Sequence, residues 1–539
     1  MTKKINYKIF SENQWVFPDD ILDGFDESLL SLDIARGGNV MIQVLTDTSV
    51  SVSDEFSLHV DNANGIRVIP YQLIPVTIHR NSAPKGKPGS TSNYEEVKDF
   101  VTRKAPFDVY DATVPMKEKL AYSGRLAFAL RFTASRELEP SVQSIKVTLQ
   151  TGGKEYVIPI TLTVHKATIP ELKDSRLTVV NWVRPSSLVE HSGSERHSEA
   201  YWETYKKLLS HMVDIRNNHL SIAESWKRIP DEAIRDENGR IIDFDLAPYE
   251  KALQLAEKAG MTKLYGPYIA HWAKWSEKEI YLLWDWEKKW RITDAEAYRQ
   301  LKIYFQRIKE MIERNGWQDK YIQPLCDEPQ FPNVEDYRTL CGIVRQLFPE
   351  VVIHDPVEVY NIAGAAEIIC IKQAIYEKYL DEFKELQSLG QRMTYYACGF
   401  PAGPTMNRTL DLPLFVGRLS FWMCHRYNFE GYLHWGYHVE GGFDNTNHAG
   451  TMAPGNHSIV YYSDVIGDYV DTVRSNNQRA GAEDWELLEI IKEKNEPLAQ
   501  ALVEKCCRTF DDYETDWRKI DGVRKEIFKY ADEYSDQKV

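Results

Sequence analysis

From about residue 175 onward, the sequence alternates between short strand-like segments and longer helix-like segments, and this alternation constrains the fold more than any other feature. The strand-like segments are Arg176–Val183, His219–Ala223, Thr262–Ile269, Tyr321–Cys326, Val351–His354, Ile368–Lys372, Met393–Cys398 and Gly431–Trp435. Helix-like segments separate most of them, and Asp294–Arg314 is the clearest, because its apolar residues recur at spacings of three and four. Eight such units over roughly 260 residues predict a (β/α)8 barrel.

The region before this alternation has a different pattern. Short segments with strand-like composition are separated there by turn residues, and they are Asn39–Leu45, Phe56–Val60, Gly65–Pro70, Leu73–Ile78, Gly124–Phe132, Ser144–Leu149 and Glu155–Val164. Regular short strands of this kind predict a β-sandwich. The stretch Asn81–Asn93 is rich in Ser, Pro, Gly and Lys and is expected to form a long exposed loop, whereas Ile169–Glu171 has the composition of a linker.

The sequence after the last barrel strand has two parts. Residues 438–462 are rich in Gly, Asn and His and predict a long loop, and residues 479–535 are predicted to be helical. We therefore expect three domains: a β-sandwich over residues 1–168, a (β/α)8 barrel over 175–462, and a C-terminal helical extension over 463–539 that packs on the barrel. The expected fold class is multidomain, with a β domain followed by an α/β domain.

Length, charge and cysteine usage narrow the kinds of partner that the chain can have. At 539 residues it is too long for one core, and its net charge of −15 argues against a nucleic acid partner. No stretch approaches the ~20 apolar residues of a membrane helix, so no membrane partner is expected. The seven cysteines are scattered, and the N-terminus has no secretory signal, which together predict a cytoplasmic protein. A homo-oligomer is compatible with the sequence.

Two adjacent acids, Asp327 and Glu328, follow the fourth predicted barrel strand. Because the active site of a (β/α)8 barrel is built at the C-terminal ends of its strands, the pair is expected at the catalytic face. Like charges at close range raise the pKa of one group, and this keeps a carboxylic acid protonated so that it can act as a general acid. The alternative is structural, since either acid could cap the following helix with Pro329 in its first turn. The strand-end position favours the functional interpretation.

Aromatic and polar side chains gather at the same strand ends. The chain has 14 Trp and 30 Tyr, and such an excess suits stacking on the apolar faces of sugar rings. The candidate substrate-binding residues are Trp182, His271, Trp272, His354, Asp355, Tyr395, Tyr396, Trp435 and Tyr437. The aromatic members could equally be packing at the top of the barrel. Strand alternation points only one of Tyr395 and Tyr396 inward.

The mechanism depends on whether a second carboxylate can act as a nucleophile. The ordinary retaining mechanism of glycosidases needs such a group ~5 Å from the acid. Strand seven supplies it in many barrel glycosidases, but residues 391–405 contain no Asp or Glu, and Asp355 or Glu358 could substitute. The adjacent pair also fits substrate-assisted catalysis, in which the sugar's own 2-acetamido oxygen attacks the anomeric carbon. Asp327 would then stabilise the amide N–H, while Glu328 would protonate the leaving oxygen and afterwards deprotonate water.

Four passages resemble glycoside hydrolase family 123 and the wider set of proteins that share its catalytic domain. They are Tyr321–Pro329 with the acidic pair, His211–Asn218, Arg474–Leu488, and the exit from the sandwich at Thr161–Pro170. The resemblance covers nearly the whole chain. It implies a β-N-acetylgalactosaminidase activity by the substrate-assisted route, with Asp327 and Glu328 as the catalytic pair and an oligosaccharide or glycoconjugate as substrate.

No metal or other cofactor is expected. His434 and His438 are four residues apart, with His448 and His457 downstream, but neither an H-E-x-x-H motif nor a carboxylate-rich framework accompanies them. The charged segment from Arg474 to Asp484 is expected to form an ion-pair network that ties the last helices to the barrel.

Three functions remain open at this point. The first is an exo-acting β-N-acetylhexosaminidase that uses Asp327 and Glu328, with N-acetylgalactosamine as the favoured sugar. The second is a glycosidase of another specificity on the same scaffold, with a protein nucleophile such as Asp355 or Glu358. The third is a non-catalytic carbohydrate-binding protein whose acidic pair caps a helix.

Overall fold

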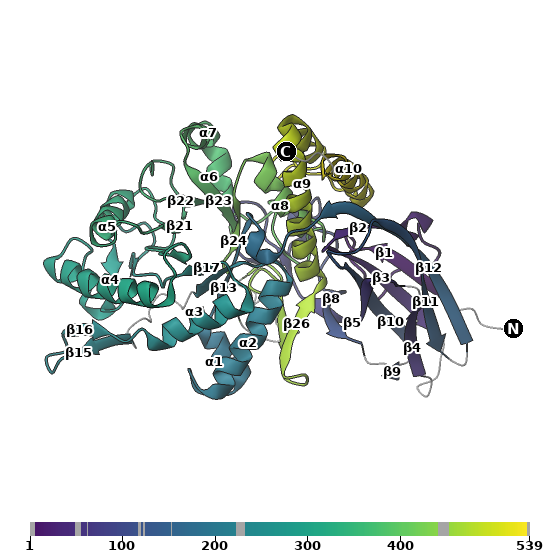
Figure 1. Ribbon diagram of the computed structural model, residues 1–539, viewed down its shortest axis with the longest axis horizontal. Helices are drawn as coiled ribbons and strands as arrows, with labels where there is room; N and C mark the ends of the chain where they lie inside the picture. Colours follow the sequence, from purple (N-terminus) through teal and green to yellow (C-terminus); the bar gives the residue numbers. More distant parts are fainter. Residues whose placement is uncertain are drawn as a thin grey trace. The chain divides into compact units, whose positions relative to one another are not determined.

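Figure 1 shows the computed structural model, which describes residues 6–48, 55–61, 63–116, 120–121, 124–151, 154–222, 232–439 and 452–535. The chain forms two compact units. The first comprises residues 1–175, 399–427 and 440–539, and the second comprises residues 176–398 and 428–439. The three-domain division expected from the sequence stays a prediction. The two compact units do not test it, because each of them contains segments that are far apart in the chain.

The first unit contains two large β-sheets. One has the strand order β1 (Asn6–Ser11), β3 (Asn39–Thr48), β10 (Gly124–Ala134), β5 (Ile66–Ile78), β8 (Phe107–Pro115), β26 (Asp468–Thr472) and β25 (Tyr461–Ser463). The other has the order β2 (Ser31–Arg36), β12 (Lys154–Thr168), β11 (Ser141–Thr151), β4 (Glu55–Asp61) and β9 (Leu120–Ala121). Neighbouring strands are antiparallel, except that β2 and β12 are parallel.

Residues from both sheets share one apolar core, as a sandwich requires. Every second residue of β11 and β12 is buried in it, and these residues join the inward side chains of β10; the cluster includes Ile145, Val147, Leu149, Ile158, Ile160, Leu162, Phe128, Leu130 and Phe132. The predicted N-terminal β-sandwich is therefore confirmed.

Several features of the first unit differ from the sequence-based expectation. Strands β1, β2, β9, β25 and β26 were not predicted, and the predicted segments Gly65–Pro70 and Leu73–Ile78 form one strand, β5. Strand β8 was not predicted, because Val109–Thr113 are buried without interruption and give no alternating pattern. The prediction that Asn81–Asn93 is a long exposed loop is wrong near its base, where β6 (Asn81–Ser82) pairs with β7 (Ser90–Thr91). The base is buried because Asp411 accepts hydrogen bonds from the backbone N–H and the hydroxyl of Ser82, at 2.6 and 2.7 Å.

The first unit also contains the helices α8 (Val416–Arg426), α9 (Val473–Glu504) and α10 (Trp517–Ser535). Helices α9 and α10 pack with the sandwich strands, and α8 packs against α9. Helix α9 begins with a capping box between Thr472 and Ser475. It is interrupted at Asn495, whose φ of −153° is not helical, two residues before Pro497. Proline lacks a backbone N–H and clashes with the preceding turn, so the break follows from the sequence.

A buried ionic network joins these helices to the sandwich. Arg418 of α8 is fully buried and donates to Asp484 of α9 at 2.5 Å and to Glu12 at 2.9 Å. Arg524 of α10 contacts the same two carboxylates at 3.1 and 3.3 Å. The predicted ion-pair network of the segment Arg474–Asp484 is thus present. Asp484 pairs with Arg418, which lies in the sequence between the seventh and eighth barrel strands, and Arg474 pairs with Asp111 of the sandwich. A buried charge is tolerated only when it is paired in this way.

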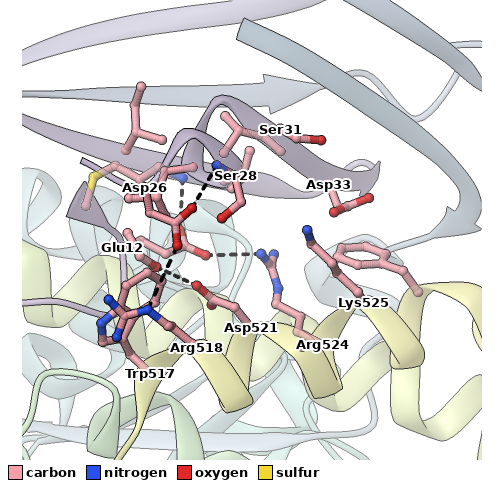
Figure 2. Close-up of a pocket in the computed structure, with 18 residues that line it drawn as sticks. Glu12, Asp26, Ser28, Ser31, Asp33, Trp517, Arg518, Asp521, Arg524 and Lys525 are labelled. Carbon is pink, nitrogen blue, oxygen red and sulfur yellow. Dashed lines mark hydrogen bonds and ion pairs between the residues drawn. The ribbon is translucent and has the colours of Figure 1, made fainter. Parts of the chain in front are cut away.

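Figure 2 shows a pocket of about 200 Å³ beside this network, between α10 and the strands β2 and β3. Its carboxylates already have partners in the protein. Asp521 accepts from Ser11 and Asn13 at 3.0 and 2.6 Å, and Asp33 contacts His165 at 2.8 Å. The charges that line this pocket are therefore largely compensated, which fits a structural role in seating α10 on the sandwich.

The second unit is a parallel eight-stranded barrel. Its strand order is β20 (Tyr321–Ile322), β17 (Lys263–Tyr265), β14 (His219–Ile222), β13 (Thr178–Val183), β24 (Gly431–His434), β23 (Arg392–Ala397), β22 (Ile368–Lys372) and β21 (His354–Val357). A parallel bridge between Gln323 and Ile353 joins the two ends of this order. All eight predicted barrel strands are present, so the predicted (β/α)8 barrel is confirmed.

Helices separate most of these strands along the chain. They are α1 (Pro185–Ser192), α2 (Glu199–Asp214), α3 (Ala247–Ala259), α4 (Ala295–Asn315), α5 (Val334–Leu347), α6 (Gln373–Lys378) and α7 (Leu380–Ser388). The apolar stripe of α4 buries Tyr304, Phe305 and Ile308, as the spacing predicted. Among the described residues, none of the helices is both long enough and apolar enough to cross a membrane.

Candidate active site

The acidic pair lies on a loop after β20 whose backbone is held at several points. The N–H of Glu328 donates to the carbonyl of Pro356 at 3.0 Å, and the N–H of Glu358 donates to the carbonyl of Pro329 at 3.1 Å. The loops that follow strands four and five are therefore clamped together. Glu328 has a φ of +46°, in the left-handed region that residues other than glycine seldom adopt. Backbone strain of this kind is typical of functional sites.

The helix-capping interpretation of the pair is wrong. Helix α5 begins at Val334, and its N-cap is Asn333, whose side-chain oxygen accepts from the N–H of Gln330 at 2.7 Å. Asp327 and Glu328 precede the cap by several residues. Their carboxylates are therefore available for a role at the barrel end.

The side chain of Glu328 is held by partners from strands six and seven. The hydroxyl of Tyr396 donates to Glu328 Oε1 at 2.6 Å, and the ammonium group of Lys372 lies 3.5 Å from the same oxygen. Lys372 also forms an ion pair with Glu358. Two carboxylates thus share one lysine whose side chain is only 7% exposed, so the three charges influence one another through little solvent.

The electrostatics of this group follow from burial and from the sharing of one lysine. Burial and the nearby Glu328 raise the pKa of Glu358, and Lys372 opposes them. Burial alone would lower the pKa of Lys372, but Cys398, Glu328 and Glu358 raise it above its ordinary value. Lys372 is therefore a permanent cation in the site.

Asp327 is oriented through its own backbone, because the indole N–H of Trp272 donates to the Asp327 carbonyl at 3.1 Å. Burial, followed by the carboxylates of Glu328 and Asp355, raises the pKa of Asp327 well above its ordinary value, while Lys372 acts in the opposite direction. Asp327 therefore holds a proton more readily than an exposed aspartate would.

His354 and Asp355 lie deep in the barrel and not at its end. Strand β21 runs from His354 to Val357, whereas the sequence placed this strand at Val351–His354. The two residues thus begin the strand. His354 contacts Tyr265 and Thr394 with its two ring nitrogens, at 2.5 and 2.7 Å. Asp355 is fully buried and accepts from the N–H of Leu325 and the hydroxyl of Tyr337, both at 2.8 Å. This placement argues for structural roles.

Several of the predicted aromatic residues do meet at the barrel end. Trp182 and Tyr396 belong to one cluster of buried side chains, and Tyr268 and Trp435 pack against it while remaining partly exposed. Trp182 and Tyr268 are in edge-to-face contact, with ring centroids 5.6 Å apart. The guanidinium of Arg184 lies 5.3 Å from the ring of Trp435. These rings form an apolar wall at this end of the barrel.

Other predicted binding residues do not belong to this cluster of rings. Tyr395 points to the other face of its strand and packs against Phe429 and Tyr432, at 5.3 and 5.2 Å between ring centroids. Strand alternation thus selects Tyr396 as the inward residue. Tyr437 is fully buried, and its backbone N–H donates to the carbonyl of Trp182. His271 is buried beside Trp272, and burial lowers the pKa of this histidine.

The sequence-based interpretation did not identify Lys372 as a site residue. Its signal was present, because Lys372 ends the apolar run Ile-Ile-Cys-Ile-Lys of strand six. In a strand, residues two apart share a face, so Lys372 lies on the same face as Cys370, which is in the barrel-end cluster. A lysine on the inner face of a barrel strand needs a carboxylate partner, and this requirement could have led to Glu358.

The described residues contain no group of three or more His, Cys, Asp and Glu side chains arranged to hold a metal ion. Of the histidines considered for such a site, His448 lies outside the described residues.

A (β/α)8 barrel with an acidic pair at the end of strand four, walled by aromatic rings, has the architecture of a glycoside hydrolase. Residues 182–491 match the family model described as the catalytic domain of glycoside hydrolase 123. The chain belongs to glycoside hydrolase family 123. It is thus an enzyme that acts on a glycan, and the interpretation as a non-catalytic binding protein is set aside.

The fold comparison agrees with this assignment. A family 123 glycoside hydrolase from Clostridium perfringens, studied for glycolipid glycan hydrolysis, is similar with a TM-score of 0.76 and 13% identity, over 98% of this chain and 99% of that one. An endo-beta-1,4-mannanase from Thermotoga petrophila gives a TM-score of only 0.34 and 10% identity, over 59% of this chain and 78% of that one, and carries no argument. No curated protein matches this chain in sequence.

Proposed function

We propose that the protein is an exo-acting β-N-acetylhexosaminidase, with N-acetylgalactosamine as the favoured sugar, and that it works by substrate-assisted retaining catalysis. The observation that carries the proposal is the rigid presentation of two adjacent carboxylates, Asp327 and Glu328, on one clamped loop. Adjacent acids on one loop act on neighbouring atoms of one substrate. A nucleophile and an acid that flank a glycosidic bond come from opposite sides instead.

The carboxylates considered as protein nucleophiles are otherwise engaged. Asp355 is fully buried and bonded within the barrel wall, and Glu358 is ion-paired with Lys372. Strand seven presents Tyr396 and not an acid. Among the described residues at these strand ends, this leaves the acetamido group of the substrate as the nucleophile that best fits the site.

The roles of the pair follow from this chemistry. The acetamido oxygen attacks C1 as the bond between C1 and the leaving oxygen breaks, and Glu328 gives its proton to that oxygen. Asp327 accepts the N–H of the acetamido group and stabilises the oxazolinium ion. Water then attacks C1 and passes a proton to Glu328, which restores the amide and retains the configuration. Tyr396 donates to Glu328 Oε1, and this leaves Oε2 free to face the leaving oxygen.

The proposed sugar rests on family membership, with support from the relative of known structure, whose studied reaction is glycolipid glycan hydrolysis. Trp182 and Trp435 are proposed to line the sugar's apolar face. A cytoplasmic location is part of the proposal, and the observation that all seven cysteines are free thiols supports it.

Hydrolysis of four chromogenic substrates tests the proposal: the β-N-acetylgalactosaminide, the β-N-acetylglucosaminide, the β-galactoside and the β-glucoside. We expect turnover of acetamido sugars only, loss of turnover in Glu328→Gln, and inhibition by a thiazoline analogue of the oxazoline. Turnover of a plain hexoside by the same site would overturn the mechanism, because that sugar has no acetamido group.

A further inference from the structure

Three aromatic rings form a small partly exposed surface on the second unit. The ring of Phe331 lies 5.5 Å from that of Tyr360 and 6.0 Å from that of Tyr379, and the two tyrosine rings are 4.4 Å apart. Phe331 is 44% exposed, and both tyrosines are partly exposed. We call these three residues the aromatic trio. Phe331 is exposed and its ring contacts are with two other partly exposed rings, so it contributes little to a core. A binding role explains the position of this side chain better than core packing does.

The trio is continuous with the catalytic loops. Phe331 comes three residues after Glu328, Tyr360 comes two residues after Glu358, and Tyr379 comes seven residues after Lys372. The same three strand-end segments thus supply the charged group and the trio. The first two segments are joined by backbone hydrogen bonds from Glu328 to Pro356 and from Glu358 to Pro329.

We infer that the aromatic trio is a leaving-group subsite, on which the sugar ring next to the scissile bond stacks. The inference rests on the proposed role of Glu328 as the general acid. That role requires the Glu328 carboxyl to be within hydrogen-bond reach of the glycosidic oxygen, so the leaving group begins there. Three residues of chain span at most about 10 Å, and Phe331 is therefore close to the ring that this oxygen joins.

The chemistry of the trio favours a sugar ring over a hydrocarbon chain. The ammonium group of Lys378 lies 5.0 Å from the ring centroid of Tyr379. Among the described residues, neither the Tyr360 nor the Tyr379 hydroxyl has a hydrogen-bond partner. An apolar surface bordered by hydroxyl groups and a cation matches a pyranose, which has apolar C–H faces and polar edges. A hydrocarbon chain has no polar edge with which to bond these hydroxyl groups.

The test compares two substrates that differ only in the leaving group. N-acetyl-β-galactosaminyl fluoride has no leaving-group ring, whereas a disaccharide with a non-reducing β-N-acetylgalactosaminyl unit has one. For Phe331→Ala we expect kcat/KM on the disaccharide to fall about tenfold and kcat/KM on the fluoride to change less than about twofold. Phe331→Trp should restore the disaccharide rate. Tyr298→Ala removes a 39% exposed ring from α4 and serves as the matched control, with no effect on either substrate.

Each other outcome overturns the inference. An equal loss on both substrates would show that Phe331 only supports the Glu328 loop, and no loss on either would show that the ring binds nothing. A loss confined to an octyl glycoside would identify a lipid subsite instead of a sugar subsite. Failure of the proposed function can be distinguished from failure of this inference, because the wild-type enzyme would then not hydrolyse the acetamido fluoride. In that case the same comparison is made with the fluoride and the disaccharide of the hexose that the enzyme does hydrolyse.

Discussion

The ammonium group of Lys372 lies 3.5 Å from Glu328 Oε1 while it is ion-paired with Glu358. One cation thus serves two carboxylates, and a third carboxylate, that of Asp327, is close enough for its pKa to respond to all three groups. Other titratable groups that interact electrostatically with this site are Tyr396, His271, Cys398 and Asp355. The charge balance of the site therefore depends on a lysine that makes no direct contribution to the proposed chemistry.

Removal of the cation should move the acidic limb of the rate profile upward. Asp327 must be ionised to stabilise the oxazolinium, and Lys372 lowers the pKa of Asp327. In Lys372→Met the acidic limb of kcat/KM is expected at higher pH than in the wild type. A pH profile on N-acetylgalactosaminyl fluoride measures this shift. A uniform loss of rate with an unmoved limb would assign Lys372 a purely structural role.

Removal of the neighbouring carboxylate should have the opposite effect. Glu358 raises the pKa of Asp327, and its loss leaves Lys372 with fewer negative partners. In Glu358→Gln the acidic limb is expected to move to lower pH, while the proposed catalytic pair remains intact. Because the two variants remove opposite charges from one ion pair, shifts in the same direction would contradict this account. Loss of all turnover in Glu358→Gln would instead revive Glu358 as the nucleophile.

The sequence predicts this architecture well where burial is regular. All eight barrel strands are short apolar runs between helices, and their number and order follow from that pattern. The sandwich strands β11 and β12 alternate because one face of each is buried, whereas both faces of β10 are buried over residues 126–130. Strand β8 was missed because both of its faces are buried over Val109–Thr113, and polar Asp111 and Thr113 interrupt the apolar run.

The site was predicted only as far as strand ends could be located. Asp327 and Glu328 were identified because an acidic pair after an apolar strand is unusual, wherever the strand is taken to end. His354 and Asp355 were predicted to bind substrate because the fifth strand was placed three residues too early. The prediction put them at the C-terminal end of this strand, whereas they are its first two residues. Lys372 was missed because its importance lies in a contact with Glu358 from another strand, and sequence spacing does not report such contacts.

The stability of the first unit should fall as the pH rises, because His165 then loses its proton. Its ring nitrogens contact Asp33 and Asp532 at 2.8 and 2.9 Å. Burial alone would lower the pKa of His165, but the two carboxylates raise it to about 9. Because the folded-state pKa lies above the unfolded value of about 6.5, the stabilisation is complete below that pH and is lost as the pH rises through about 9.

The size of this effect is about 3 kcal/mol, since each pKa unit corresponds to about 1.4 kcal/mol. Calorimetric unfolding at pH 6 and pH 9.5 measures it. In His165→Gln the difference between the two pH values should shrink by about this amount. An unchanged pH dependence in the His165 variant would refute the assignment.

Arg418 should be among the costliest residues to replace in the first unit. Its fully buried guanidinium bonds to Asp484 and Glu12. Arg418→Met leaves those carboxylates with Arg524 as their remaining cationic partner, and the expected loss is about 3 kcal/mol. Replacement of Arg508, which pairs with Asp512 at the surface, should cost less than about 1 kcal/mol. Similar unfolding temperatures for both variants would show that the network is not a stabilising element.

Glu328→Gln and Asp327→Asn should differ in how their rates depend on the leaving group. A general acid matters most when the leaving oxygen is basic, so Glu328→Gln is expected to lose about 100- to 10,000-fold on the disaccharide and much less on the fluoride in the first, glycosidic-bond-breaking step. Asp327 acts on the acetamido group, which both substrates share. Asp327→Asn should therefore lose activity to a similar extent on both. Single-turnover measurements of fluoride release isolate this step from the later attack of water. If Asp327→Asn showed the stronger dependence on the leaving group, the roles of the two acids would have to be exchanged, and a uniform loss in both variants would show that neither acid protonates the leaving oxygen.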